Sequence, residues 1–260
     1  MNYKNICHEV AQLARTTGLQ LLKYREKNAL VIETKGHNDF VTQMDKYTEG
    51  LLVEGLDKIL PEAGYIAEEG TRTDKGEDYK WIIDPIDGTT NFIHLMPPYA
   101  ISIALMHKGE IVVGVVYEMS RDELFTAWSG GGAYLNGKPI KVTAAKSIAQ
   151  SLVATGFPYN EFSRMDNYMK TLTHFMKHSQ GVRRIGSAAT DMAYVAAGRF
   201  ELFYEYDLKP YDVAAGAILI TEAGGKVSDF KGGNNYIFGR EIVATNGNVH
   251  AECIEITKEI

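Results

Sequence analysis

Two carboxylates lie three positions apart directly after an apolar run at residues 81–83. They are Asp84 and Asp87, and a proline and a glycine belong to the same short segment. Proline fixes one backbone dihedral and glycine admits conformations that other residues resist, so such a turn can direct both carboxylates and the carbonyl of Ile86 to one point. Carboxylate and carbonyl oxygens are the ligands that Mg²⁺ prefers in proteins. The segment therefore predicts a metal site.

A purely structural interpretation of this segment is the alternative. Asp-Pro and Asp-Gly are ordinary turn-forming pairs that need no ligand. Three polar residues, Thr89, Thr90 and Asn91, follow at once. Their presence favours a site over a simple turn.

A series of motifs resembles the inositol monophosphatase family, whose members are metal-dependent, lithium-sensitive phosphatases. The matching segments are, in the family's order, DFVT at 39–42 leading to Asp45, AEE at 67–69, DPIDGTTN at 84–91, GAYLNG at 132–137, YDVAAG at 211–216 and TEAGG at 221–225. They span most of the chain. The third resembles the family's first signature, and the fifth, followed by the sixth, resembles its second signature. The resemblance implies an α/β fold, a layered αβαβα sandwich whose sheets are mainly antiparallel or mixed.

The resemblance also implies a phosphomonoesterase with two or three Mg²⁺ ions. By motif match, Glu68, Asp84 and the carbonyl of Ile86 would hold the first ion. Asp84 would bridge to a second ion, which Asp87 and Asp212 would complete, and a third would lie near Glu68. Four carboxylates placed so closely would repel one another strongly unless cations lay between them.

Further residues take catalytic and substrate-binding roles by the same match. Asp45 and Thr89 correspond to the pair that orients and deprotonates the attacking water, and Glu68 is placed with them as a catalytic residue. Glu205 matches a carboxylate that accepts hydrogen bonds from ring hydroxyls, as an ionised acceptor does well. Lys35 is similar to a lysine of the family's mobile loop. The residues expected to contact substrate are Asp87, Gly88, Thr89, Gly186, Ser187, Ala188, Glu205 and Asp212.

The expected activity is Mg²⁺-dependent hydrolysis of a phosphate monoester, with myo-inositol 1-monophosphate as the substrate. Mg²⁺ can cancel the charge of the ester, lower the pKa of bound water and align the attacking and leaving oxygens. The alternatives are another phosphatase of the superfamily, acting on fructose 1,6-bisphosphate, 3′-phosphoadenosine 5′-phosphate or histidinol phosphate. A metal-binding regulatory protein without catalysis is a further alternative, against which the presence of both Asp45 and Thr89 argues.

The elements that must position these residues can be read from periodicity and turn signals. Helical spacing of apolar residues predicts helices over about 3–27, 42–60, 161–177, 188–197 and 211–223. Short β-prone runs predict strands at about 30–34, 80–83, 100–106, 111–117, 124–128, 152–155, 201–204 and 242–245. Short connections favour antiparallel pairing. The polar run 71–79 is expected to be an exposed loop or hairpin tip.

Two packed halves fit this order of elements. An N-terminal half, residues 1–145, would carry most of the metal ligands, and a C-terminal half, residues 146–260, would carry Asp212 and the substrate contacts. A chain of 260 residues buries enough surface to fold without a metal or disulfide staple. Any metal is therefore expected to serve chemistry.

The net charge, the apolar runs and the cysteine content restrict the partners and the compartment that we expect for the protein. The formal charge is −6, from 27 basic and 33 acidic residues, which argues against a nucleic-acid partner and an anionic membrane surface. No apolar run approaches the roughly 18 residues that span a bilayer. Cys7 and Cys253 are the only cysteines, so a reducing, cytoplasmic setting is expected. The resemblance implies a homodimer. His174 and His178 are spaced for one helix face but lack the rest of a zinc motif, which favours a solvated surface.

Overall fold

The computed structural model describes residues 1–27, 32–36, 39–70 and 78–260, and within 32–42 it describes the backbone alone. The helices are α1 (Tyr3–Lys27), α2 (Gln43–Ile59), α3 (Thr89–Ile93), α4 (Met165–His178), α5 (Ala188–Ala196), α6 (Pro210–Glu222) and α7 (His250–Thr257). The strands are β1 (Ile32–Gly36), β2 (Asp39–Thr42), β3 (Gly64–Ala67), β4 (Tyr79–Asp87), β5 (Ala100–His107), β6 (Glu110–Glu118), β7 (Glu123–Trp128), β8 (Gly132–Leu135), β9 (Lys138–Ile140), β10 (Leu152–Thr155), β11 (Gly181–Arg183), β12 (Leu202–Tyr206), β13 (Lys226–Ser228) and β14 (Glu241–Thr245). Residues 30–31 and 71–77 of the predicted strand and loop lie outside the described residues.

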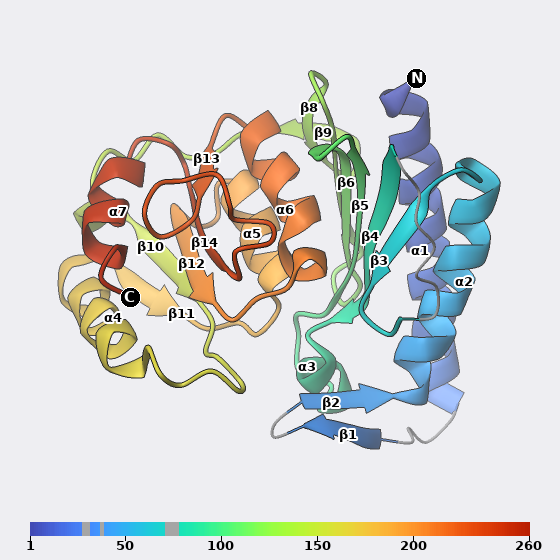
Figure 1. Cartoon of the computed structure of the whole chain (residues 1–260), viewed down its shortest axis with the longest axis horizontal. Helices are drawn as coiled ribbons and strands as arrows, with labels where there is room; N and C mark the ends of the chain where they lie inside the picture. The colour runs from blue at the N-terminus through green and yellow to red at the C-terminus, as the bar shows by residue number, and fades with distance from the viewer. Residues whose placement is uncertain (28–31, 37–38, 71–77) are drawn as a thin grey trace.

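The first layer consists of α1 and α2, which pack against one face of a seven-stranded sheet (Figure 1). Along α1 the buried side chains include Ile6, Val10, Ala14 and Leu21, a spacing that places them on one face of a helix. They join the apolar residues of β4, β5 and β6 in a continuous core. The helical periodicity of the N-terminal segment therefore has a direct cause, since one face of α1 covers the sheet.

The seven-stranded sheet runs in the order β3-β4-β5-β6-β7-β8-β9. Only its first pair, β3 with β4, is parallel, and every other neighbouring pair is antiparallel. Both faces of β4 are covered, with Trp81 and Ile83 in one core and Ile82 in the other. Burial on both faces explains why residues 81–83 form an unbroken apolar run.

The middle layer consists of α5 and α6, which lie between the two sheets (Figure 1). Close approach of α6 to the first sheet depends on Gly114 in β6, because a Cβ there would lie 2.4 Å from Ile218 Cγ2. The second sheet has five strands in the order β11-β10-β12-β14-β13. Its β11, β10 and β12 are parallel, whereas β14 is antiparallel to both β12 and β13.

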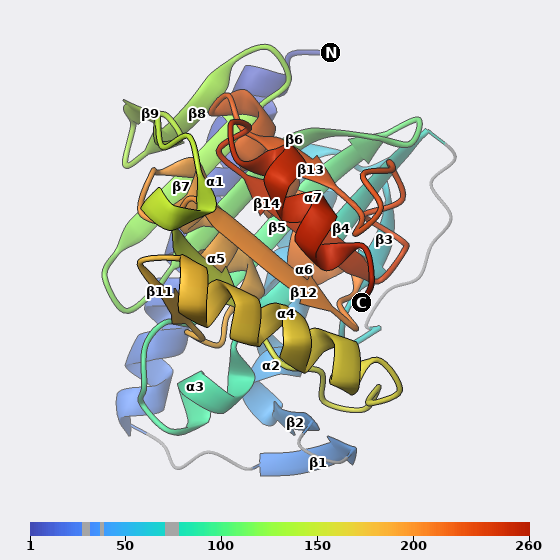
Figure 2. The same cartoon turned by 90° about the vertical axis from the view of Figure 1, so that its left-hand side faces the viewer.

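The outer face of the five-stranded sheet is covered by α4 and α7, as Figure 2 shows from that side. The layers are therefore helix, sheet, helix, sheet, helix, and this arrangement confirms the predicted αβαβα sandwich with its antiparallel and mixed sheets. The boundary between two halves near residue 145 stays a prediction. Within the described residues, no helix combines the length and apolar character that a membrane crossing requires.

One buried histidine in the C-terminal core is held neutral. His250 is 3% exposed and lies 3.0 Å by Nδ1 from Thr245 Oγ1 and 3.0 Å by Nε2 from Ser228 Oγ. Ser228 donates its own proton to the Asp229 carbonyl, so Ser228 Oγ accepts from Nε2–H and Nδ1 accepts from Thr245. Burial, with the charge of Lys226, lowers the pKa of His250 to about 4.

The lowered pKa of His250 predicts that the folded protein loses stability as the pH falls below neutral. Between the ordinary histidine pKa of about 6.5 and the folded value of about 4, the unfolded chain binds more protons than the folded one, so stability falls as pH falls. His250→Gln should remove about 2 kcal/mol of this loss between pH 7 and pH 4.5. Denaturant unfolding of both proteins across this range measures it. Parallel stability curves for the two proteins would contradict the assignment.

Candidate metal centre

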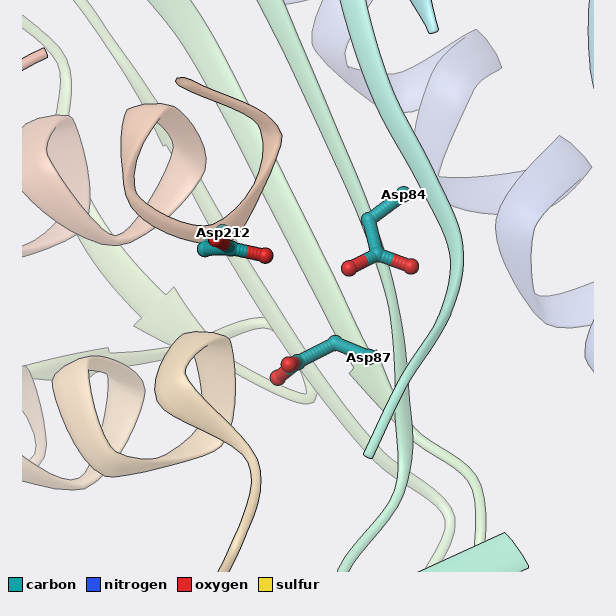
Figure 3. A group of neighbouring side chains, drawn as sticks. All are labelled: Asp84, Asp87 and Asp212. Atoms are coloured by element: carbon teal, nitrogen blue, oxygen red, sulfur yellow. The ribbon is translucent and has the colours of Figure 1, made fainter. Parts of the chain in front are cut away.

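Strand β4 carries an irregularity where its two aspartates lie. Asp84 pairs with Ser102 and Asp87 pairs with Ala100, so β4 has one residue more than β5 between these pairs. In a regular strand, residues three apart point to opposite faces. The extra residue is a β-bulge, which re-aims side chains, and it brings both carboxylates to one side (Figure 3). The sequence placed a turn after Ile83, whereas the strand continues to Asp87.

Gly88 follows the last residue of this strand and is the N-cap of α3, with a φ of 88°, a left-handed conformation that favours glycine. A Cβ at this position would also lie 3.0 Å from the Gly186 carbonyl. The segment after β4 is therefore pressed against residues from the distant part of the chain. Both the conformation and the contact account for a glycine at this point of the motif.

The third aspartate comes from the start of α6. The helix begins at Pro210 rather than at the predicted Tyr211, and its N-cap is Lys209, so Asp212 is the third helical residue. Asp212 Oδ2 accepts a hydrogen bond of 2.6 Å from the Lys209 amide. This bond holds the carboxylate at the mouth of the helix, facing β4 (Figure 3).

Carboxylate oxygens of Asp84, Asp87 and Asp212 lie within 4.8 Å of one another, and no other group of this kind occurs among the described residues. Burial first, and then Glu68, Asp87 and Asp212, raise the pKa of Asp84 well above its ordinary value. Burial and then Asp87 raise the pKa of Asp212 in the same way. Three neighbouring carboxylates that disfavour one another's charge, those of Asp84 and Asp87 being buried, are suited to a divalent cation, and hard oxygen donors suit Mg²⁺.

Asp87 joins the cluster to the middle layer. Its Oδ2 accepts hydrogen bonds from the Ser187 hydroxyl and from the Ala189 amide, the latter at 2.8 Å. Ser187 is also the N-cap of α5, where its Oγ accepts from the Thr190 amide. These bonds lower the pKa of Asp87, but burial outweighs them and the pKa rises to about 6. The end of β4 is thus tied to the start of α5.

Thr89 and Asp45 lie beside the cluster. Thr89 Oγ1 is 3.0 Å from the Ile86 carbonyl and 3.3 Å from Asp45 Oδ1. Asp45 is 1% exposed and belongs to the first turn of α2. A hydroxyl has one proton, so Thr89 can donate to only one of its two acceptors at full strength.

A cavity of about 300 Å³ brings the predicted residues together. Its lining includes Glu68, Asp84, Ile86, Asp87, Gly88, Thr89, Gly186, Ser187, Ala188, Glu205 and Asp212. Asp45 does not line it but reaches it through Thr89. The side chains of Lys35 and of the DFVT motif at 39–42 lie outside the described residues.

Several residues of the cavity wall were not singled out from the sequence. They include Phe157, Tyr159, Asp191, Lys209 and Arg240. Asp191 had a signal in the sequence, because it is a lone charge inside the otherwise apolar or small run 188–196. A charge in a fully buried helix calls for a partner or a function.

The two histidines that were set aside do not join a metal group. His174 and His178 have ring centroids 4.3 Å apart, and His178 Nδ1 lies 2.9 Å from the His174 carbonyl. Both belong to α4 on the outer layer. Both residues are exposed to solvent, as the surface interpretation expects.

Comparisons with known proteins agree with the geometry. "Nus factor SuhB" of Salmonella typhimurium is 44% identical over 238 residues, which cover 91% of this chain and 89% of that protein. The crystal structure of extragenic suppressor protein suhB from Bartonella henselae matches with a TM-score of 0.91 at 38% identity, covering 96% of this chain and 97% of that one. Inositol monophosphatase from Anabaena matches with a TM-score of 0.89 at 34% identity, covering 100% and 98% of the two chains.

The sequence profile described as the inositol monophosphatase family matches residues 4–260. The match includes every segment on which the resemblance rested, and the neighbours by structure share the layered fold. The chain therefore belongs to the inositol monophosphatase family.

Proposed function

We propose that the protein hydrolyses the phosphate monoester of a small polyol, with myo-inositol 1-monophosphate as the substrate and Mg²⁺ as the cofactor. The observation that carries the proposal is the content of one cavity: three clustered carboxylates, a threonine bonded to a buried aspartate, and a separate carboxylate at Glu205. Membership of a family of Mg²⁺-dependent phosphatases supports it. The inositol ester is the finer part of the proposal.

Two or three Mg²⁺ ions would be held by Glu68, Asp84, Asp87, Asp212 and the carbonyl of Ile86. Bound Mg²⁺ would offset the charge of the phosphate and lower the pKa of a water, which could then lose a proton and attack the phosphate. The protein contributes fixed oxygen donors, because backbone amides hold the carboxylates of Asp84, Asp87 and Asp212 in place. Ligands that are already ordered lose little entropy when an ion binds.

Thr89 and Asp45 would remove the proton of the attacking water. Thr89 Oγ1 would accept a proton from the water and pass its own proton to Asp45 Oδ1, which lies 3.3 Å away. After the relay Thr89 is again a neutral hydroxyl, whereas Asp45 has gained one proton and lost its negative charge. Because Asp45 is shielded from bulk solvent, the proton it receives comes through Thr89.

Backbone groups near the cluster would bind the phosphate. The first N–H groups of a helix lack partners inside that helix, and Gly88 and Thr89 begin α3 beside the carboxylates. Gly186, Ser187 and Ala188 line the same cavity at the start of α5. Backbone N–H groups of this kind suit an anion.

Glu205 would hold the leaving group. It is 8% exposed and lies in β12, and the absence of a side chain at Gly156 makes room for it, since a Cβ there would lie 2.0 Å from Glu205 Oε2. A buried carboxylate facing a cavity is a strong acceptor for hydroxyl donors.

Glu205→Ala is expected to change substrate preference more than metal affinity. The value of kcat/KM for inositol 1-phosphate should fall about 10- to 100-fold, since hydrogen bonds from substrate hydroxyls to a charged acceptor are lost. Mg²⁺ titrations followed by thermal unfolding should match those of the wild type. Equal losses for all phosphate esters would contradict the role.

A phosphate-release panel tests the proposed activity. Inositol 1-phosphate, fructose 1,6-bisphosphate, 3′-phosphoadenosine 5′-phosphate and histidinol phosphate are compared with Mg²⁺ and with a chelator. The proposal expects the highest kcat/KM for inositol 1-phosphate and no turnover with the chelator. A higher value for another ester would replace the substrate, and no release from any ester would overturn the enzyme assignment.

Other expectations stay predictions. Formation of a homodimer, inhibition by Li⁺ and the lack of a nucleic-acid partner belong to this group. Several relatives bear the name Nus factor, which is a role different from ester hydrolysis. For this chain the carboxylate cluster and its cavity favour the phosphatase as the primary proposal.

A further inference from the structure

Asp191 is a buried carboxylate in the wall of the cavity with no assigned role. It lies in the first turn of α5, is 1% exposed, and its Oδ1 has no hydrogen-bond partner. All residues of α5 are buried, so bulk solvent does not reach the carboxyl from the outer side of the helix. An unpaired carboxyl in such surroundings costs stability.

The position in the helix does not explain this carboxyl. An acidic residue in the first turn is favourable because of the helix dipole, but that benefit requires no burial. In α4 the first-turn acidic residue is Asp166, which is exposed to solvent. Asp191 bears the additional cost of burial, and a function in the cavity would account for it.

A second carboxylate shares this part of the cavity. The charge of Glu205 adds to burial in raising the pKa of Asp191. Among the described residues, none donates a hydrogen bond to the carboxylate of Glu205, which Gly156 admits to the cavity. Two acceptors, one from α5 and one from β12, therefore line the cavity without protein donors of their own.

The positive charge of Arg184 nearby indicates which kind of substrate donor suits the two carboxylates. Arg184 lowers the pKa of both Asp191 and Glu205, so its positive charge already acts on the pair. Its guanidinium donates to the Tyr159 hydroxyl at 3.2 Å rather than to either carboxylate. A substrate ammonium would meet this charge, whereas neutral hydroxyls would supply donors without repulsion.

We propose that Asp191 is a second specificity residue, which accepts a hydrogen bond from a hydroxyl of the leaving group while Glu205 accepts from another. The substrate class is then a phosphate monoester of a polyol with at least two hydroxyls beyond the ester oxygen. This inference rests on the proposed phosphatase function and adds the residue that reads the second hydroxyl.

Two esters that differ in hydroxyl donors test the inference. Inositol 1-phosphate has several, and p-nitrophenyl phosphate has none in its leaving group. Asp191→Asn should lower kcat/KM about 10- to 100-fold for the inositol ester and leave the nitrophenyl ester within about threefold of the wild type. The matched control is Asp166→Asn, the same change in the first turn of a helix outside the cavity, which should alter neither value.

Thermal unfolding with and without Mg²⁺ shows that each variant is folded, and Asp191→Ser serves as a second variant if the asparagine protein does not fold. Equal losses on both esters would assign Asp191 a structural role and overturn the inference. Unchanged rates on both esters would overturn it as well. A wild-type protein that releases phosphate from neither ester would instead sink the proposed function, so the two failures are distinct.

Discussion

Asp84→Asn is expected to lower kcat by about 10³-fold or more while the fold is retained. Asp84 lies in the bulge of β4, and its carboxylate is within 4.8 Å of those of Asp87 and Asp212. An amide keeps the shape of the side chain but removes the charge that a shared cation would require. Phosphate release at saturating Mg²⁺ measures the loss. Full activity of this variant would contradict the metal assignment.

The stability of the same variant gives a second readout that does not depend on turnover. Without metal, burial and its neighbours raise the pKa of Asp84, so the charged form is disfavoured in the folded state. Stability of the metal-free protein then falls as pH rises from about 4 through the raised pKa values, of which that of Asp87 is about 6. Metal-free Asp84→Asn should melt higher than metal-free wild type at neutral pH.

Mg²⁺ should reverse this order. A ligand that binds only the folded state stabilises it in proportion to its affinity, so Mg²⁺ should raise the Tm of the wild type more than that of Asp84→Asn. Thermal unfolding with a chelator and with Mg²⁺ gives both comparisons. The same Mg²⁺-dependent shift in the two proteins would show that Asp84 is not a ligand.

Asp45→Asn is expected to lower kcat by about 10²- to 10⁴-fold, the range over which a positioned general base acts. Asp45 is the buried acceptor behind Thr89, at 3.3 Å from its hydroxyl, and an amide there cannot take up the proton. KM and the Mg²⁺-dependent Tm shift should stay near the wild-type values, because Asp45 is outside the carboxylate cluster. Steady-state kinetics and thermal unfolding measure these quantities.

The matched control for this variant lies on the same helix. Asp57 belongs to α2 and accepts a hydrogen bond of 2.8 Å from the Tyr65 hydroxyl, and it does not line the cavity. Asp57→Asn should leave kcat within about twofold of the wild type. A loss at Asp57 as large as that at Asp45 would assign the effect to α2 rather than to a proton acceptor.

Long elements with a continuous apolar run or a clear helical period were predicted well. The strands predicted at 100–106, 111–117 and 124–128 correspond to β5, β6 and β7, and the helix at 3–27 has the bounds of α1. These segments have continuous apolar runs or a clear helical period. Each bears enough buried side chains for the pattern to determine the element.

Shorter elements were missed for a common reason. Strands β3, β8, β9, β11 and β13 have three or four residues each, and their conformation depends on the neighbouring strand rather than on local propensity. Helix α7 was also missed, and α4 starts at Met165 rather than at 161. A few residues carry too little periodicity to define a helix or its first turn.

In the candidate site, a sequence motif identified residues, but their geometry depends on contacts between distant parts of the chain. The motif at 84–91 identified the carboxylates, but only the pairing with β5 reveals the bulge that turns Asp84 and Asp87 to one side. The anchoring of Asp87 by α5 is likewise a contact between residues about a hundred positions apart. Asp191 stood outside every motif, and its burial is what gives it significance.

The position of α5 and α6 between the two sheets determines how the molecule should come apart. Their buried side chains fill one core together with residues of both sheets, so removal of this layer would expose an apolar face on each side of it. Each sheet on its own would then expose a large apolar surface to water, which is unfavourable. Hydrogen exchange should accordingly report one cooperative unit across both sheets. Asp87 in β4 and Asp212 in α6 face each other where the first sheet meets the middle layer, and a cation bound between them would strengthen this contact.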